Sequence, residues 1–144
     1  MSRTPAAIDE HLVTLLPLPA PELEDYHTLR YALEEKGAGE SLRVLAVTSP
    51  VVGDGKTTTA VNLAGVMARK HGARILLIDG DLRRPSVARV LGLGDVGHRG
   101  LADAIGNPEC ALEDVTTPVP GANLHVVAIG TALRDPFELL RGPR

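Results

Sequence analysis

The stretch Leu42–Lys70, LRVLAVTSPVVGDGKTTTAVNLAGVMARK, decides the fold of this chain. It begins with the apolar run of residues 42–47, which is typical of a strand that is buried on both faces. A loop with two glycines follows, and a helix is predicted to begin at or just after Lys56. Glycine lets backbone N–H groups approach a ligand, and the N-terminus of a helix favours an anion. This order of elements predicts a phosphate-binding loop.

The side chains at the start of the helix are those that a nucleoside triphosphate needs. In the pattern G-x-x-x-x-G-K-S/T the lysine contacts the β/γ-phosphates and the hydroxyl ligates Mg²⁺, and Lys56 and Thr57 take these two places. Pro50 replaces the first glycine and has no N–H to donate. The Asp54 carboxylate is expected to face solvent. The alternative is a glycine-rich turn with a solvated lysine. The residues predicted to contact the nucleotide are Gly53, Asp54, Gly55, Lys56, Thr57 and Thr58.

Acidic and basic residues follow the second predicted strand, RILLID at 74–79. Asp79 lies at its carboxyl end, where open α/β sheets bind their ligands. Asp81, Arg83 and Arg84 come directly after it. Together these residues offer a ligand for metal-bound water, a general base and cations for triphosphate charge. Alternatively, Asp79 only caps the following turn.

Composition excludes several classes of function. A chain of 144 residues forms at most one domain, and its formal net charge of −3 argues against nucleic-acid binding. The single cysteine, Cys110, excludes an intrachain disulfide and fits a reducing cytosol. No apolar stretch is long enough to span a membrane, and the spacing of the histidines predicts no metal site made of protein ligands alone. With one Phe, two Tyr and no Trp, the core is predicted to consist of Leu, Val, Ile and Ala.

The rest of the chain predicts a leader and several short elements. Residues 1–20 contain an apolar patch, HLVTLL, followed by prolines at alternate positions, which favour a flexible leader. Packing of this patch against the domain or a partner is the alternative. Other predicted elements are helices over 21–36, 86–91 and 101–105, a strand over 124–129 and a helix beginning near 135, with Ser86 as the cap of the second helix.

These segments together resemble the cytoplasmic catalytic domain of bacterial tyrosine kinases that control capsule and exopolysaccharide synthesis. TSPVVGDGKTTTAVNLA is similar to the phosphate loop and helix of that family, and ILLIDGDLRRP is similar to its second acidic motif. GLADAIG, NLHVVAIG and DPFELL resemble segments that follow in the same order. LVTLL and ELEDYHTLRYAL are similar to its interdomain linker and its E-x-x-R-x-x-R helix. The resemblance implies an α/β P-loop NTPase fold with three layers and a mainly parallel sheet.

The same resemblance implies a set of cofactors and residue roles. ATP and Mg²⁺ are the expected cofactors, and a tyrosine-bearing protein is the expected substrate. Lys56 would contact the β/γ-phosphates, Arg83 would contribute positive charge to nucleotide binding, and Thr57, Asp79 and Asp81 would hold the metal. The two aspartates would also activate the incoming tyrosine hydroxyl, whose ordinary pKa of about 10 makes a nearby base useful.

Partners and location are implied in the same way. In the family, the E-x-x-R-x-x-R helix assembles a ring in which one subunit phosphorylates its neighbour, and a membrane-bound activator or co-polymerase works beside it. Glu24 and Arg30 match this motif, whereas His27 replaces the middle arginine, so ring assembly is expected to be weaker or pH-sensitive. The expected location is the cytoplasm, at the inner face of the plasma membrane.

Two family features are missing from the chain: a later strand ending in D-x-P-P, and a tyrosine-rich tail. Residues 21–144 are therefore expected to form a partial domain, incomplete at its C-terminus, that is marginally stable and binds nucleotide weakly when alone. A rival class is a dimerising P-loop ATPase of the partition or division-site type. Such proteins usually carry a lysine where Val51 stands and ordinarily lack D-x-D-L-R-R. A third alternative is a non-catalytic scaffold that nucleotide orders. The sequence favours the kinase.

Overall fold

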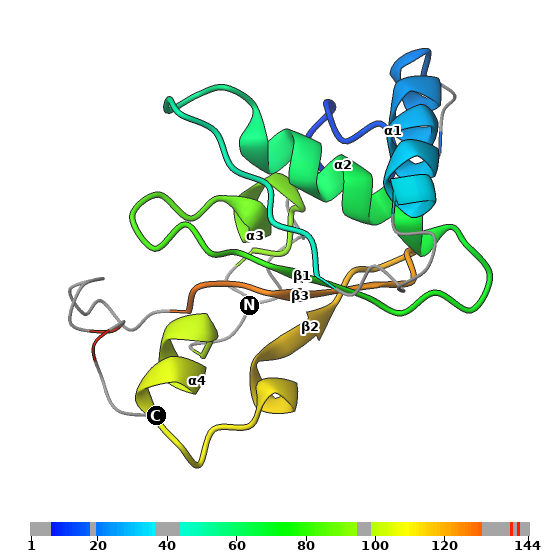
Figure 1. Ribbon diagram of the computed structural model, residues 1–144. Coiled ribbons are helices and arrows are strands. Elements are labelled where there is room, and N and C mark those ends of the chain that lie inside the picture. The colour runs from blue at the N-terminus through cyan, green and yellow to red at the C-terminus, as the bar shows by residue number, and fades with distance from the viewer. Residues whose placement is uncertain are drawn as a thin grey trace.

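The computed structural model of the chain describes residues 7–17, 20–36, 44–94, 99–130, 139 and 141. A three-stranded sheet in the order β1-β3-β2 lies at its centre. Strand β1 (Ile75–Ile78) pairs in parallel with β3 (Leu124–Val127), and β2 (Thr116–Pro118) pairs with β3 in antiparallel orientation. Helix α2 (Lys56–Ala68) covers one face of this sheet and α4 (Leu101–Gly106) lies on the other side (Figure 1). The predicted α/β class is confirmed.

The alternation of strand side chains explains why helices cover both faces of the sheet. Leu124 and Val126 join the cluster under α2, whereas Val127 joins a second cluster with Ala104 of α4 and Cys110. Successive strand residues point to opposite faces, so each face of β3 supplies apolar side chains to one helix. Two shorter elements lie one on each side of the sheet: α3 (Val87–Val90) packs beside α2, and the 3-10 helix Leu112–Val115, which packs against α4, leads into β2.

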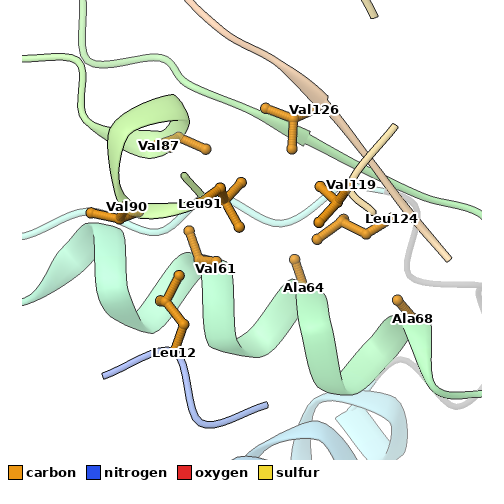
Figure 2. Packing of buried hydrophobic residues seen from close by; sticks show 10 residues of the cluster. All are labelled: Leu12, Val61, Ala64, Ala68, Val87, Val90, Leu91, Val119, Leu124 and Val126. Carbon is orange, nitrogen blue, oxygen red and sulfur yellow. The ribbon is translucent and has the colours of Figure 1, made fainter. Parts of the chain in front are cut away.

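Small and branched aliphatic side chains form the main core, as the scarcity of aromatic residues predicts. Figure 2 shows Val61 and Ala64 pointing from α2 toward Leu91 and Leu124. Alanine on the buried face of a helix leaves room for the larger strand side chains, so interdigitation fills the space without aromatic rings. The ten buried residues of the cluster are Leu12, Val61, Ala64, Ala68, Val87, Val90, Leu91, Val119, Leu124 and Val126.

The segment before α1 differs from the flexible leader that the sequence predicts. Leu12 is 1% exposed and joins the core beside Val61. The backbone N–H and the hydroxyl of Thr14 donate to Oδ1 of the buried Asn62 at 3.1 and 3.2 Å, and Asn62 Nδ2 donates to the carbonyl of His11 at 2.8 Å. Residues 11–14 thus pack against the domain, which was the alternative to a flexible leader, because the buried side-chain amide of Asn62 on α2 forms hydrogen bonds with their backbone. The domain boundary near residue 21 stays a prediction.

Gly65 makes this docking possible. A Cβ at this position would overlap the Thr14 hydroxyl, so the small residue on α2 admits the segment. Helix α1 (Glu22–Lys36) then packs on α2, and an ion pair of 3.2 Å between Glu34 and Lys70 joins it to the chain just after α2. Among the described residues, no helix is both long and apolar enough to cross a membrane.

One sequence-based strand prediction, over residues 42–47, is wrong in its described part, and one strand was missed. Residues 44–49 form no strand, and Val44 and Leu45 are 87% and 41% exposed. An apolar run forms a strand only where another segment pairs with it, and among the described residues the strand pairings are β1 with β3 and β2 with β3. Strand β2 was not predicted, because its sequence, TTP, is short and contains proline. The predicted helix near residue 135 lies outside the described residues except for 139 and 141.

Candidate nucleotide site

The loop before α2 has the backbone that a phosphate-binding loop requires. Gly53 and Gly55 adopt φ angles of 93° and 80°, in the left-handed region that side chains with a Cβ rarely enter. Gly55 is the N-cap of α2, so the helix begins at Lys56 as predicted. The N–H groups of the first helical turn have no carbonyl partner within the helix. The exposed loop therefore brings backbone donors and the positive end of the helix dipole to one place.

Lys56 reaches across this place to the loop that follows β1. Its Nζ lies 2.7 Å from Oδ2 of Asp81, and the two side chains are 32% and 24% exposed. Asp81 Oδ1 accepts the backbone N–H groups of Arg84 at 2.9 Å and of Arg83 at 3.2 Å. The hydrogen bond from Lys56, followed by that from the Arg84 N–H, lowers the pKa of Asp81. Asp81 is thus an ionised counter-ion of the phosphate-loop lysine.

Asp79 is a buried carboxylate that holds the same loop in place. It is 5% exposed, and its Oδ1 accepts the N–H of Asp81 at 3.1 Å. Its Oδ2 accepts the N–H groups of Ser86 at 2.9 Å and Val87 at 3.0 Å, at the start of α3. The capping alternative therefore describes what Asp79 does in this structure. A carboxylate offers about four acceptor positions, and three are used here by backbone donors.

Ser86 is a site residue that sequence reasoning missed. The sequence predicts that its side chain caps α3, but among the described contacts it makes no cap bond, because Asp79 occupies the N–H groups there. The Ser86 hydroxyl instead lies 3.1 Å from the hydroxyl of Thr57 in the first turn of α2. The sequence signal that could have found this contact is weak: a hydroxyl residue seven positions after a strand-terminal acid.

The remaining predicted residues lie around these contacts. Asp54 is exposed in the loop, as expected, and Thr58 is half-buried in the first turn of α2. Arg83 is exposed, and its backbone is fixed by Asp81. The structure thus brings together the loop, Lys56, Thr57 and Asp81. Asp79 holds the segment after β1 in place through its backbone hydrogen bonds.

Residues 41–144 match the protein-family model ParA, which is described as "NUBPL iron-transfer P-loop NTPase". The chain belongs to the ParA family of P-loop NTPases. This match confirms the P-loop NTPase fold that the resemblance implied. A phosphate-binding loop is the element with which proteins of this fold bind nucleotide.

Relatives of this ParA-family chain include tyrosine kinases. Tyrosine-protein kinase YwqD of Bacillus subtilis (strain 168) is 33% identical over 117 residues, which cover 81% of this chain and 48% of YwqD. The solved BceF tyrosine kinase domain is similar with a TM-score of 0.69 and 34% identity, covering 85% of this chain and 47% of that one. The chimerical protein CapA2B2 is similar with a TM-score of 0.73 and 26% identity, covering 97% and 61%.

These comparisons confirm the resemblance to the P-loop domain of bacterial tyrosine kinases. The chain spans less than two thirds of each of the three proteins.

Proposed function

We propose that this chain is the nucleotide-binding part of an ATP-dependent protein-tyrosine autokinase that regulates extracellular polysaccharide synthesis. The observation that carries the proposal is the meeting of Lys56 and Asp81 beside the N-terminus of α2, with the Thr57 hydroxyl one residue away. A cation, free backbone N–H groups and a hydroxyl are the donor set for a triphosphate and its metal. In this proposal Lys56 exchanges Asp81 for the β/γ-phosphates.

The donor set also fits Mg²⁺, which prefers oxygen ligands and keeps several waters. Thr57 and Asp81 would hold the metal directly or through water, and the metal would neutralise charge that develops on the transferred phosphoryl group. Asp79 has an acceptor position left beside its three backbone bonds, as a group that receives a phenolic proton needs. Arg83, on the same loop, would add positive charge next to the nucleotide.

The kinase relatives support the proposal of a membrane partner, whereas the location rests on the sequence resemblance and the absence of nucleic acid on the net charge of −3. We propose a membrane-bound activator, a tyrosine-bearing protein substrate, no nucleic acid, and a place in the cytoplasm at the inner face of the plasma membrane. Self-assembly would use the face of α1 that carries Glu24, His27 and Arg30. Glu24 is exposed, whereas His27 and Arg30 are half-buried, and the Arg30 guanidinium lies 4.6 Å from the ring centroid of Tyr31.

Phosphoryl transfer to tyrosine tests the kinase proposal. The purified chain is incubated with radiolabelled ATP, Mg²⁺ and a Glu/Tyr copolymer, and phosphotyrosine is measured. Lys56→Ala is expected to abolish labelling, whereas Lys70→Ala, which removes a lysine just beyond the C-terminal end of α2, is expected to retain it. Labelling that survives Lys56→Ala contradicts the proposal.

A second candidate function is the dimerising ATPase, which the match to the ParA family model favours. It predicts release of inorganic phosphate without any phosphotyrosine, with a rate per chain that rises with protein concentration because two copies must meet. A third outcome, nucleotide binding without phosphotyrosine or phosphate release, would favour the non-catalytic scaffold. The same reaction mixtures distinguish all three.

A further inference from the structure

The contact between Thr57 and Ser86 is not explained by the assignments above. Ser86 stands at the N-cap of α3, yet its hydroxyl turns to α2 and lies 3.1 Å from Thr57 Oγ1. Its backbone is held in place by the bond from its N–H to the buried Asp79 carboxylate at 2.9 Å. Asp79 thereby takes over the capping of α3 and holds the Ser86 backbone in place, which leaves the serine hydroxyl available to Thr57.

The chemistry of a hydroxyl ligand indicates a role for the contact between Thr57 and Ser86. A threonine hydroxyl that ligates a cation presents an oxygen lone pair, so its hydrogen must point elsewhere and needs an acceptor. Threonine in a helix also divides between two χ1 rotamers. An acceptor beside Thr57 selects one rotamer and one hydroxyl orientation before the ligand arrives. Ser86 Oγ lies at hydrogen-bonding distance from Thr57 Oγ1, and either hydroxyl can be the donor.

We infer that Ser86 is a positioning residue for the nucleotide site: it accepts the Thr57 hydroxyl hydrogen and leaves the Thr57 lone pairs available to Mg²⁺. The inference rests on the proposed nucleotide binding and extends it to a residue outside the phosphate loop. Ser86 itself touches neither nucleotide nor metal. Asp79 and Ser86 form a support that connects the end of β1 to the first turn of α2.

Nucleotide affinity measured with and without metal tests this role. A fluorescent ADP analogue is titrated into the chain in EDTA and in Mg²⁺. The ratio of the Kd in EDTA to the Kd in Mg²⁺ measures how much the metal contributes to affinity. Ser86→Ala is expected to reduce this ratio about 3- to 10-fold, the effect of one hydrogen bond, and to leave the Kd in EDTA unchanged. Ser86→Thr, which keeps the hydroxyl, should preserve the ratio.

Two further variants separate positioning from structural support. Thr57→Val removes the ligand hydroxyl, and Ser86→Ala added to it should have no further effect, since the two changes remove the same interaction. Thr28→Ala deletes a hydroxyl that bonds the Glu24 carbonyl within α1 and serves as the control. Thermal unfolding is recorded for every variant.

The outcomes are distinct. An unchanged ratio in Ser86→Ala overturns the inference, and so does a loss of affinity that is equal with and without metal and accompanied by a lower Tm, because that pattern indicates structural support. If the unaltered chain binds no nucleotide, or if Lys56→Ala does not weaken binding, the proposed function itself fails and the positioning role fails with it.

Discussion

Replacing Asp81 by asparagine is predicted to strengthen the binding of metal-free nucleotide. Lys56 forms an ion pair with Asp81 in this structure, with 2.7 Å between Nζ and Oδ2. A phosphate must compete with that carboxylate for the lysine. The asparagine side chain keeps an oxygen that can accept the N–H groups of Arg83 and Arg84, so the loop is expected to retain its turn.

The magnitude follows from the geometry. Unit charges at this separation interact by about 6 kcal/mol at an effective dielectric constant of about 20. Most of this is cancelled because both groups lose water and side-chain freedom, and both remain a quarter to a third exposed. Pairs of this kind retain about 1 kcal/mol, which corresponds to roughly a fivefold change in affinity. We therefore expect the Kd for ATP in EDTA to fall about fivefold in Asp81→Asn.

Isothermal titration calorimetry with ATP in EDTA and low salt is the assay. Asp54→Asn is the matched control, because it removes a carboxylate of the same charge from the exposed phosphate loop without touching the Lys56 pair. Any general effect of charge appears in both variants, and only Asp81→Asn should add the effect of releasing Lys56. An equal gain in the two variants, or no gain in Asp81→Asn, refutes the competition argument. With Mg²⁺ present, the gain should vanish or reverse, since Asp81 is a proposed metal ligand.

Three other predictions concern stability. Asn62→Ala should lower the free energy of unfolding in urea by about 1–3 kcal/mol, because the buried groups of Thr14 lose their partner; unchanged stability together with unchanged exchange of the Thr14 amide would contradict this. Gly100→Ala should destabilise by about 1–3 kcal/mol, since its Cβ would overlap the backbone that follows β3, and a midpoint equal to wild type would show that the two backbones can separate. The hydrogen bond to Asp9 raises the pKa of His11, and the bonds from His11 lower the pKa of Asp9, so this pair stabilises the segment fully between pH 3.8 and 6.5, and the effect is lost as the pH rises through the raised pKa of His11. The difference in stability between wild type and Asp9→Asn should therefore shrink between pH 6 and 8, and a constant difference would argue against the pair.

Local sequence was sufficient for the elements that carry their own signals. Helix α2 follows from two glycines and an apolar stripe, and β1 follows from RILLID with an acid at its end. The approach of Lys56 to a carboxylate after β1 was also foreseeable, because the sequence places the phosphate loop and the two aspartates after predicted strands, and the carboxyl ends of parallel strands meet at one edge of an α/β sheet. The sequence could not indicate whether Asp79 or Asp81 forms that pair, because both residues lie close to the end of the strand.

Interactions between distant segments account for what the sequence could not predict. The docking of Leu12 and Thr14 depends on Asn62 and on the missing Cβ of Gly65, neither of which marks the leader itself as ordered. Residues 44–47 form no strand although they are apolar, and Val44 and Leu45 are exposed, because strand structure depends on pairing with another segment. Capping of α3 was assigned to Ser86 from its position, whereas a carboxylate seven residues earlier takes that role.

The parallel pairing of β1 with β3 also sets an order of events during translation. Leu124, the first residue of the partner strand, leaves the ribosome 46 residues (124 − 78) after Ile78. At about 5–20 residues per second, this interval lasts roughly 2 to 10 seconds. Throughout it, the nascent chain carries the ILLI segment without the partner that it has in the finished sheet. Chaperone occupancy on stalled nascent chains should therefore be highest between these two points and fall once LHVV has emerged.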